Sequence, residues 1–431
     1  MKRRHFMIGA GSLALVSQGV RAVSVAQTRD QTSRKIQLPL KQLRDQYRRD
    51  LFEDFLPFME KYVIDPEFGG FTCNTDHLGN RVSYNKSSWF EGRGTWVYSF
   101  LYNNLAREQK YLDVARHSID LIMKSKPATN ELWPKEITRE GKPVTSADGE
   151  VYGDLFIAEG LAEFSKATGD RTFWDQAKEI LLKCVRLYDR PDYRPTIGQT
   201  YLGPAAKPFP GARIQGVWMT LIRAATQMLQ MRDDKEIEAI ATRCVSAITD
   251  HHYNPRFGLI NELLNHDLSR PDDEYAQLVY TGHCIENLWM LLLVATRRRV
   301  QTLFDKLAVW LKRHIEVAWD DVYGGVFRNL QNVDRNVWLV DKVLWAQEEV
   351  LIGMMLLIER RGYDWAAEIF RKTNDYVREK YPLRAHGSPL WIYASDREVN
   401  YQTFLNMPKR VENFHHPRHL MLNLLSLGRM T

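Results

Sequence analysis

Phe68-Gly69-Gly70-Phe71 recurs in similar form as Phe257-Gly258-Leu259-Ile260 and as Tyr323-Gly324-Gly325-Val326-Phe327. On both sides of these stretches, apolar residues recur every three or four positions, which is the spacing of an amphipathic helix rather than of a strand. One such stripe consists of Leu43, Tyr47, Leu51, Phe55 and Phe58. We interpret the three aromatic-glycine stretches as one loop, repeated between pairs of helices.

About twelve helical stretches follow one another along the chain, and turns with Gly, Pro, Asn or Asp bound most of them. The expected helices span residues 40–63, 88–105, 110–125, 151–168, 171–187, 213–231, 234–250, 278–297, 300–315, 337–361, 364–380 and 413–428. Taken in pairs they form hairpins, and a closed ring of hairpins buries every apolar face. We predict an all-α fold, an (α/α)6 barrel, with one domain over residues 39–431. An open stack of helical repeats remains the alternative.

Composition narrows the classes of function. The chain has 59 basic and 53 acidic residues, and part of this small excess falls within the first thirty positions, which gives little support for a nucleic-acid partner. Its four cysteines, Cys73, Cys184, Cys244 and Cys284, show no metal-ligand spacing. We therefore predict no metal site and four buried free thiols.

The first residues, MKRRHFMIGAGSLALVSQGVRAVSVAQ, have the layout of a targeting peptide. Arg3-Arg4 before an apolar run resembles the twin-arginine export signal. That run, Phe6 to Val16, is shorter than the about twenty residues that span a bilayer. We predict a signal peptide over residues 1–26, a short linker over 27–38, and export to the periplasm without stable membrane insertion after cleavage.

No phosphate loop, dinucleotide glycine motif, HExxH or GxSxG occurs, so the candidate site depends on histidines, arginines and exposed aromatics. His283 and Glu286 lie three residues apart, hence on one face near the start of a helix. A buried histidine that serves only the core is the alternative interpretation. The segment from Glu412 to His419 brings three histidines and an arginine to another helix start, where exposed residues around an Asn413 cap are the alternative.

A third cluster surrounds Arg93, which stands between Gly92 and Gly94 and is flanked by Trp89 and Trp96. Aromatic rings beside a cation suit a pocket in which a sugar ring stacks while polar groups bind its hydroxyls. An ordinary surface ion pair is the alternative for this arginine.

These clusters, in this order, resemble the N-acylglucosamine 2-epimerase family. The similar segments are GGFTCNTDHLGN at 69–80, WFEGRGTWVYSFLY at 89–102, YGDLFIAEGLAEF at 152–164, GHCIENLW at 282–289, KVLWAQEE at 342–349 and FHHPR at 414–418. Together they cover essentially the whole mature chain. The resemblance implies an (α/α)6 barrel that epimerises or isomerises a free sugar without a redox cofactor.

The resemblance also implies residue roles. His283 and His415 are the two acid/base groups and Arg93 is the cation beside the reacting oxygens. The supporting pocket residues are Trp89, Glu286, Trp345, Glu349 and Arg418. Inversion at C2 removes a proton beside the carbonyl and returns one to the opposite face of a planar enediolate, so it requires two bases on opposite sides. Histidine suits both tasks because its pKa lies near neutrality, and Glu286 is expected to orient an imidazole.

Several alternatives stay open. Glu91 and Leu344 replace the family's usual Gln and Trp, and residues 408–413 replace its Trp-Lys-rich lead into the last block. The sequence does not distinguish an epimer from a ketose product, and the family resemblance leaves a homodimer open. The other classes are a glycoside or unsaturated-uronyl hydrolase with a carboxylate pair and a sugar-binding protein without turnover. The carboxylates available to a hydrolase are Asp154, Glu159, Glu286 and Glu349.

Overall fold

The computed structural model describes residues 38–146, 149–195, 202–407 and 410–431. The chain divides into two units, Met1–Lys35 and Ile36–Thr431. The predicted signal peptide and nearly all of the predicted linker lie outside the described residues. Within the described part, no helix is both long and apolar enough to cross a membrane.

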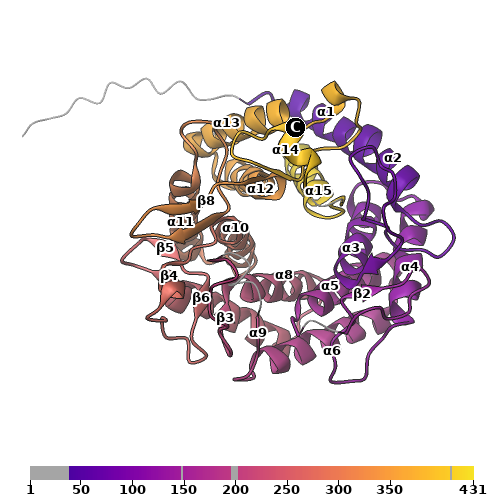
Figure 1. Ribbon diagram of the computed structural model, residues 1–431, viewed down its shortest axis with the longest axis horizontal. Coiled ribbons are helices and arrows are strands. Elements are labelled where there is room, and N and C mark those ends of the chain that lie inside the picture. The colour runs from indigo at the N-terminus through magenta and orange to yellow at the C-terminus, as the bar shows by residue number, and fades with distance from the viewer. Residues whose placement is uncertain (1–37, 147–148, 196–201, 408–409) are drawn as a thin grey trace, which may run out of the picture. The chain divides into compact units, whose positions relative to one another are not determined.

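Two concentric rings of helices form the unit Ile36–Thr431 (Figure 1). The inner ring consists of α3 (Ser88–Asn104), α5 (Tyr152–Thr168), α8 (Gln215–Met231), α10 (Thr281–Arg297), α12 (Leu344–Arg361) and α15 (His415–Met430). The outer ring consists of α1 (Leu40–Arg49) with its continuation η1 (Asp50–Phe55), α2 (Leu56–Phe58) and η2 (Met59–Val63), then α4 (Gln109–Met123), α6 (Arg171–Tyr188), α9 (Lys235–Ser246) with η3 (Ala247–His252), α11 (Gln301–Ala318) and α13 (Asp364–Lys380).

The two ends of the chain close the ring. Each inner helix packs on the next, and α15 contacts α1, α3 and α12, so the last inner helix pairs with the first outer one. This arrangement confirms the predicted (α/α)6 barrel and excludes an open stack of repeats, because no end of the ring stays uncovered.

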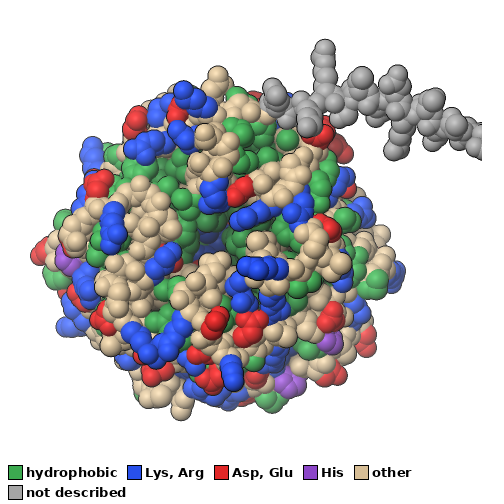
Figure 2. Space-filling view, turned by 180° about the vertical axis from the view of Figure 1, so that it is seen from behind, with side chains coloured by type: hydrophobic (Ala, Val, Ile, Leu, Met, Phe, Trp, Pro, Cys, Tyr) green, Lys and Arg blue, Asp and Glu red, His purple; other side chains and the backbone are tan. Residues whose placement is uncertain are grey.

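Burial explains the two helix types. In α5 every residue from Tyr152 to Ser165 is buried, as expected for a helix with neighbours on all sides. The outer α6 buries a stripe that includes Trp174, Ala177, Leu181 and Cys184, while its other face meets solvent. On the face shown in Figure 2, basic and acidic side chains are interspersed, and hydrophobic side chains are exposed around a hollow near the middle.

Short antiparallel strand pairs connect the helices. They are β1 (Lys86–Ser87) with β2 (Glu136–Ile137), β3 (Arg213–Ile214) with β6 (Leu263–Leu264), β4 (Tyr253–Asn254) with β5 (Leu259–Ile260), β7 (Asn329–Asn332) with β8 (Val337–Leu339), and β9 (Lys342–Val343) with β10 (Ala394–Ser395). The remaining turns are η4 (Glu274–Gln277), η5 (Arg384–His386) and α14 (Tyr401–Leu405).

One predicted helix was wrong in its first part. The helix expected over 337–361 begins only at Leu344, because residues 337–343 form β8 and β9. β-branched and aromatic residues such as Val337 and Trp338 favour strands, and Asn336, with φ 52°, turns the chain from β7 into β8.

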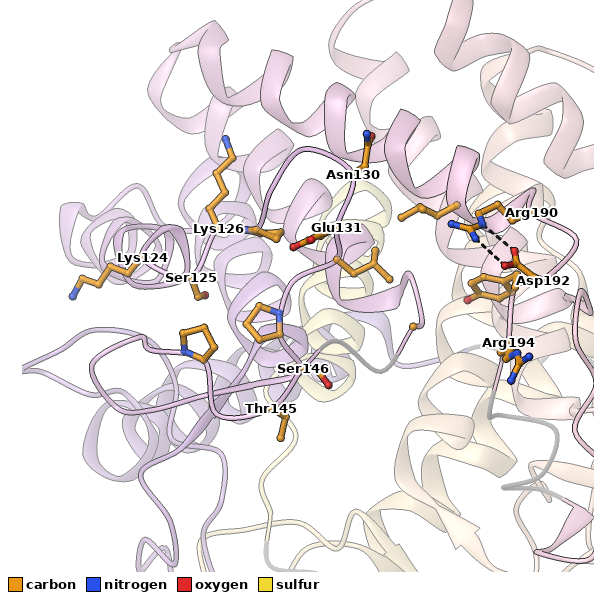
Figure 3. Close-up of a pocket in the computed structure, with 17 residues that line it drawn as sticks. Lys124, Ser125, Lys126, Asn130, Glu131, Thr145, Ser146, Arg190, Asp192 and Arg194 are labelled. Atoms are coloured by element: carbon orange, nitrogen blue, oxygen red, sulfur yellow. Dashed lines mark hydrogen bonds and ion pairs between the residues drawn. The ribbon is translucent and has the colours of Figure 1, made fainter.

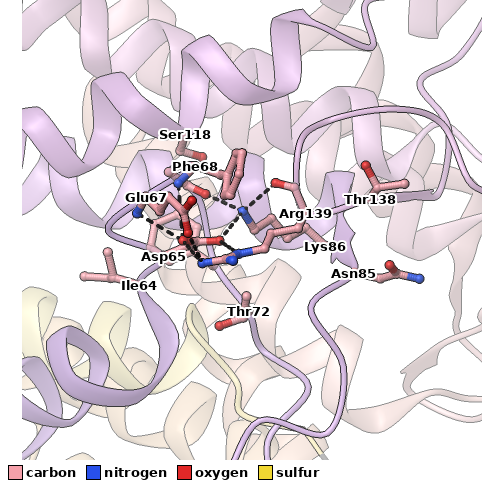
Figure 4. A network of polar contacts seen from close by, with 12 residues as sticks. Ile64, Asp65, Glu67, Phe68, Thr72, Asn85, Lys86, Ser118, Thr138 and Arg139 are labelled. Atoms are coloured by element: carbon pink, nitrogen blue, oxygen red, sulfur yellow. Dashed lines mark hydrogen bonds and ion pairs between the residues drawn. The ribbon is translucent and has the colours of Figure 1, made fainter.

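The repeated aromatic-glycine loop has a chemical basis in its first and third copies. In the first, Lys86 Nζ donates to Asp65 Oδ2 at 3.0 Å and to the Gly69 carbonyl at 2.5 Å, while Arg139 makes two bonds to the Asp65 carboxylate (Figure 4). Burial opposes ionisation of Asp65, but hydrogen bonds from Arg139 and Lys86 outweigh it and hold its pKa well below the usual range.

The third copy repeats this network with Lys342, Asp320 and Arg397. Lys342 Nζ donates to Asp320 Oδ2 at 3.0 Å and to the Gly324 carbonyl at 2.5 Å. Both lysines come directly before an inner helix, so each network fixes the point at which that helix enters the barrel.

Candidate active site

A cavity of about 220 Å³ lies among the first turns of the inner helices. Its lining residues are Trp89, Arg93, Tyr152, Phe156, Met219, Thr220, Arg223, Tyr280, His283, Glu286, Met290, Arg328, Trp345, Arg410, Glu412, Phe414 and His415. Residues predicted from four separate sequence segments therefore meet in one place. Because cavities for drug-sized ligands measure about 300–1,000 Å³, this smaller one suits a monosaccharide or the end unit of a longer sugar.

His283, in the first turn of α10, is held by a carboxylate. Its Nδ1 lies 3.0 Å from Oε1 of Glu262, which is fully buried and comes directly before β6. Burial raises the pKa of Glu262, and the neighbouring His283 offsets part of that rise. The edge of the Tyr280 ring packs on the imidazole with 4.0 Å between ring centroids. Glu262 was not among the residues predicted from the sequence, where its signal is a carboxylate within an otherwise mostly apolar run, residues 259–264.

His415, the first residue of α15, has a carboxylate beside it as well. Its Nδ1 lies 3.4 Å from Glu412 Oε1, and the same oxygen lies 3.4 Å from Arg93 Nη1. Burial lowers the pKa of His415, and the Glu412 charge recovers only part of the loss because Arg93 and Arg418 oppose it. Burial also opposes ionisation of Glu412, but the charges of His415, Arg93 and Arg410 outweigh it and keep its pKa well below the usual range.

Trp345 lies beside both histidines. The centroid of its indole ring is 5.9 Å from that of His283 and 5.4 Å from that of His415, on which it stacks. A ligand in the cavity therefore meets two imidazoles that contact the same indole ring.

Arg93 is pressed among aromatic rings. Its guanidinium carbon lies 4.1 Å from the Phe156 ring centroid, 4.8 Å from that of Phe414 and 5.4 Å from that of Trp89. Trp96, the other tryptophan near Arg93 in sequence, does not line the cavity and donates from Nε1 to Gln227. Gly92 has a packing role, since a Cβ there would lie 2.5 Å from the α5 backbone at Phe156 and Ile157.

Two of the predicted substrate-binding residues lie behind the lining. Arg418 and Glu349 are fully buried and absent from the cavity wall, so the structure does not bring them to a ligand. Arg418 Nη2 donates to Glu286 Oε1 at 2.7 Å and also to Glu349. Arg418, which reaches Glu286 from α15, is its hydrogen-bond partner, and the orientation of an imidazole by Glu286 stays a prediction. Burial opposes ionisation of Glu286, but the charges of Arg418, His415 and His283 outweigh it and lower its pKa.

Among the described residues, two groups of buried side chains have metal-ligand chemistry: Glu286, Glu349 and His415, and Glu348, His416 and His419. In the first, Arg418 already bonds to both carboxylates, so a cation does not fit there. In the second, His416 Nδ1 lies 2.5 Å from Glu348 Oε1, which is the length of a direct hydrogen bond. That the protein holds no metal stays a prediction. The four cysteines are buried free thiols, as predicted.

A larger depression of about 940 Å³ lies elsewhere, lined by Lys124, Lys126, Arg190, Asp192 and Arg194 among others (Figure 3). None of the described residues that line it is a histidine, and the contact drawn there is the Arg190–Asp192 pair. It therefore lacks the acid/base groups that distinguish the smaller cavity.

The double ring of helices and the polar, aromatic-lined cavity define an (α/α)6-barrel protein of the sugar-epimerase type. The sequence profile of the N-acylglucosamine 2-epimerase (GlcNAc 2-epimerase) family matches residues 69–418, and the chain belongs to this family. It is 25% identical over 308 residues to N-acylglucosamine 2-epimerase of Bos taurus, which covers 68% of this chain and 69% of that protein.

Solved structures agree on the fold. The structure of cellobiose 2-epimerase from Bacillus thermoamylovorans B4167 superposes with a TM-score of 0.74 at 16% identity and covers 89% of this chain and 99% of its own. A crystal structure of D-mannose isomerase gives a TM-score of 0.68 at 15% identity, with 90% and 97% coverage.

Proposed function

We propose that this protein is a sugar 2-epimerase or aldose-ketose isomerase that moves protons with His283 and His415 through an enediolate. The observation that carries the proposal is that two histidines, each beside a carboxylate, line one cavity of monosaccharide size. Family membership supports the same class of reaction. The product, an epimer or a ketose, depends on whether the proton returns to C2 or to C1.

The two imidazoles suit opposite tasks. His415, with its lowered pKa, is neutral at pH 7 and can accept the C2 proton. His283 donates from Nδ1 to the Glu262 carboxylate, which leaves Nε2 as the ring nitrogen that can exchange a proton with the substrate. In the reverse direction the roles exchange.

Arg93 supplies the charge that an enediolate oxygen needs. Its guanidinium is buried among aromatic rings and held by Glu412, so it needs little rearrangement as negative charge develops. Trp89 and Trp345 offer faces on which a sugar ring can stack.

A hydrolase with a carboxylate pair receives less support. Of the four carboxylates considered from the sequence, only Glu286 lines the cavity. Asp154 pairs with Lys183, Glu159 with Arg223 and Glu349 with Arg418.

Proton NMR in D2O with free sugars tests the proposed function. The purified mature protein is incubated with glucose, mannose, N-acetylglucosamine, cellobiose and uronic acids. Deuterium at C2 together with a new epimer or ketose is the expected result. Cleavage of an oligosaccharide without exchange at C2 would instead favour the hydrolase.

We also propose that the protein is exported by its twin-arginine segment, Arg3-Arg4, and acts in the periplasm on sugars released from external glycans. Cell fractionation of the full chain and of an Arg3→Lys, Arg4→Lys variant tests this. The variant is expected to stay in the cytoplasm, and equal export of both would contradict the proposal.

A further inference from the structure

The cavity wall is rich in guanidinium groups. Arg93, Arg223, Arg328 and Arg410 line it, whereas its lining carboxylates are Glu286 and Glu412. A neutral sugar presents hydroxyl groups, which need hydrogen-bond partners but no excess of positive charge.

Most of these charges are balanced one to one. Arg328 Nη2 lies 2.5 Å from Asp341 Oδ2, and Arg223 pairs with Glu159. Glu286 is engaged by Arg418 from behind. These contacts pair Arg328, Arg223 and Glu286 with opposite charges.

The side next to Glu412 is different. Arg93 Nη1 lies 3.4 Å from Glu412 Oε1 and Arg410 Nη2 lies 3.5 Å from Glu412 Oε2, so one carboxylate serves two permanent cations. His415 adds a third positive group whenever it is protonated. The excess positive charge of the cavity is therefore located beside Glu412.

Arg410 is the more available of the two cations. Its side chain is 44% exposed, against 10% for Arg93, and its contact with Glu412 is longer than the about 2.7–2.9 Å of a charge-assisted hydrogen bond. Arg93 is enclosed by aromatic rings, whereas Arg410 has one ring nearby, that of Tyr393 at 5.2 Å. A planar, partly exposed guanidinium suits two-point binding of a carboxylate or a sulfate.

A second observation also indicates a polar ligand. Arg223 Nη2 is buried and has no hydrogen-bond partner among the described residues, although the side chain lines the cavity. Buried donors are rarely left unpaired, so an acceptor on the bound sugar fits this position.

We propose that the sugar bound in this cavity carries an anionic substituent, a carboxylate or a sulfate ester, and that Arg410 binds it. The inference rests on the proposed function for the reaction and names the class of substrate. The reacting carbon then lies between the histidines, and the anionic group lies toward Arg410.

Matched pairs of sugars test the proposal in the D2O exchange assay. Glucose is compared with glucuronate and with glucose 6-sulfate, and mannose with mannuronate, so that each pair differs only at C6. The expected result is a kcat/KM at least tenfold higher for an acidic sugar than for its neutral partner. A clear preference for carboxylate over sulfate, or the reverse, identifies the anion.

Variants then locate the anion. Arg410→Gln is expected to lower the acidic-to-neutral ratio about ten- to hundredfold, mainly through KM, because a charge-assisted pair is lost. Arg410→Lys keeps the charge and is expected to retain most of the preference. Arg256→Gln is the matched control, since this exposed arginine pairs with Asp334 away from the cavity. An unchanged ratio in Arg410→Gln, or a larger fall in Arg328→Gln, would overturn the assignment to Arg410.

Calorimetric measurements of sugar binding distinguish the proposed anionic substrate from the proposed epimerase or isomerase function. Wild type that binds glucuronate more tightly than glucose, and loses that preference in Arg410→Gln, supports the inference even if no sugar exchanges hydrogen at C2. Exchange that is confined to neutral sugars would overturn the inference and leave the proposed function standing.

Discussion

The surroundings of His283 and His415 differ in the carboxylate that contacts each imidazole. Glu262 holds His283 through a 3.0 Å contact, and no arginine of the described part of the chain forms an ion pair with it. Glu412 contacts His415 but also Arg93 and Arg410. A carboxylate that also pairs with two arginines stabilises a neighbouring imidazolium less than a carboxylate that contacts the imidazole alone. Similar histidine–carboxylate pairs can therefore give an acid on one side of a cavity and a base on the other.

Removal of either histidine is the largest change that tests this comparison. His283→Asn and His415→Asn are each expected to lower the rate of epimerisation or isomerisation about 10²–10⁴-fold, the usual contribution of a general acid or base. His386→Asn, at an exposed position outside the cavity, is the control. Circular dichroism checks that the variants are folded, and full activity in both active-site variants would remove the basis of the mechanism.

Arg93→Gln is expected to have the next largest effect, a fall in kcat of about 10²–10³-fold with a smaller change in KM, because a preorganised charge is lost. It also bears on the comparison, since Arg93 is one of the charges that lower the pKa of His415. The acidic limb of the pH–rate profile should therefore move to higher pH in this variant. Steady-state kinetics between pH 4 and 9 measures both effects.

The two carboxylates can be neutralised one at a time. The Glu412 charge stabilises the imidazolium of His415, so Glu412→Gln should lower the pKa of His415. In the direction in which His415 is the base, Glu412→Gln moves the acidic limb of the profile to lower pH, whereas Glu262→Gln, whose carboxylate contacts the other histidine, leaves that limb in place. In the wild type the acidic limb is expected below pH 6.5, the ordinary histidine value. Movement of the same limb in both variants would show that the two histidines are not distinguished in this way.

Glu91→Gln is expected to have the smallest effect on the reaction rate, because it changes the stability of the fold rather than the cavity. Glu91 is fully buried outside the cavity, and burial raises its pKa from 4.5 to about 7. The pKa of Glu91 is higher in the folded than in the unfolded state. Its contribution to the free energy of unfolding is therefore largest below pH 4.5 and falls as the pH rises to about 7. The free energy of unfolding of the variant should therefore exceed that of wild type by up to about 3 kcal/mol at pH 8, with a higher Tm, and differ little from it at pH 4.5. Thermal melts at the two pH values measure this, and an equal difference at both would contradict it.

Gln347 supports that expectation. Its Oε1 accepts from the Val326 backbone N–H at 2.8 Å and its Nε2 donates to the Val326 carbonyl. Glu91 occupies the corresponding place after the first loop, where its Oε1 accepts from the Phe71 N–H at 2.9 Å. A glutamine is therefore compatible with this position.

Sequence periodicity predicted the barrel helices well. Inner and outer helices differ in how much of their surface is apolar, and this difference is visible in the spacing of apolar residues along the sequence. It also indicated His283, His415, Arg93, Trp89, Trp345 and Glu286, since unusual residue types cluster at helix starts. Depth within the barrel was not predictable, which is why Arg418 and Glu349 were assigned to the pocket. Glu262 and the Arg410–Glu412 contact depend on pairings through loops, such as β3 with β6, that local spacing does not encode.

The measurement that tests the two-histidine claim most directly is deuterium exchange at C2, started separately from each of the two epimers, in His283→Asn and His415→Asn. Because each base serves one face of the enediolate, one variant should still exchange the hydrogen of one epimer, and the other variant that of the second. Equal loss of exchange from both epimers in either variant, or equal retention, would contradict the assignment of one histidine to each face.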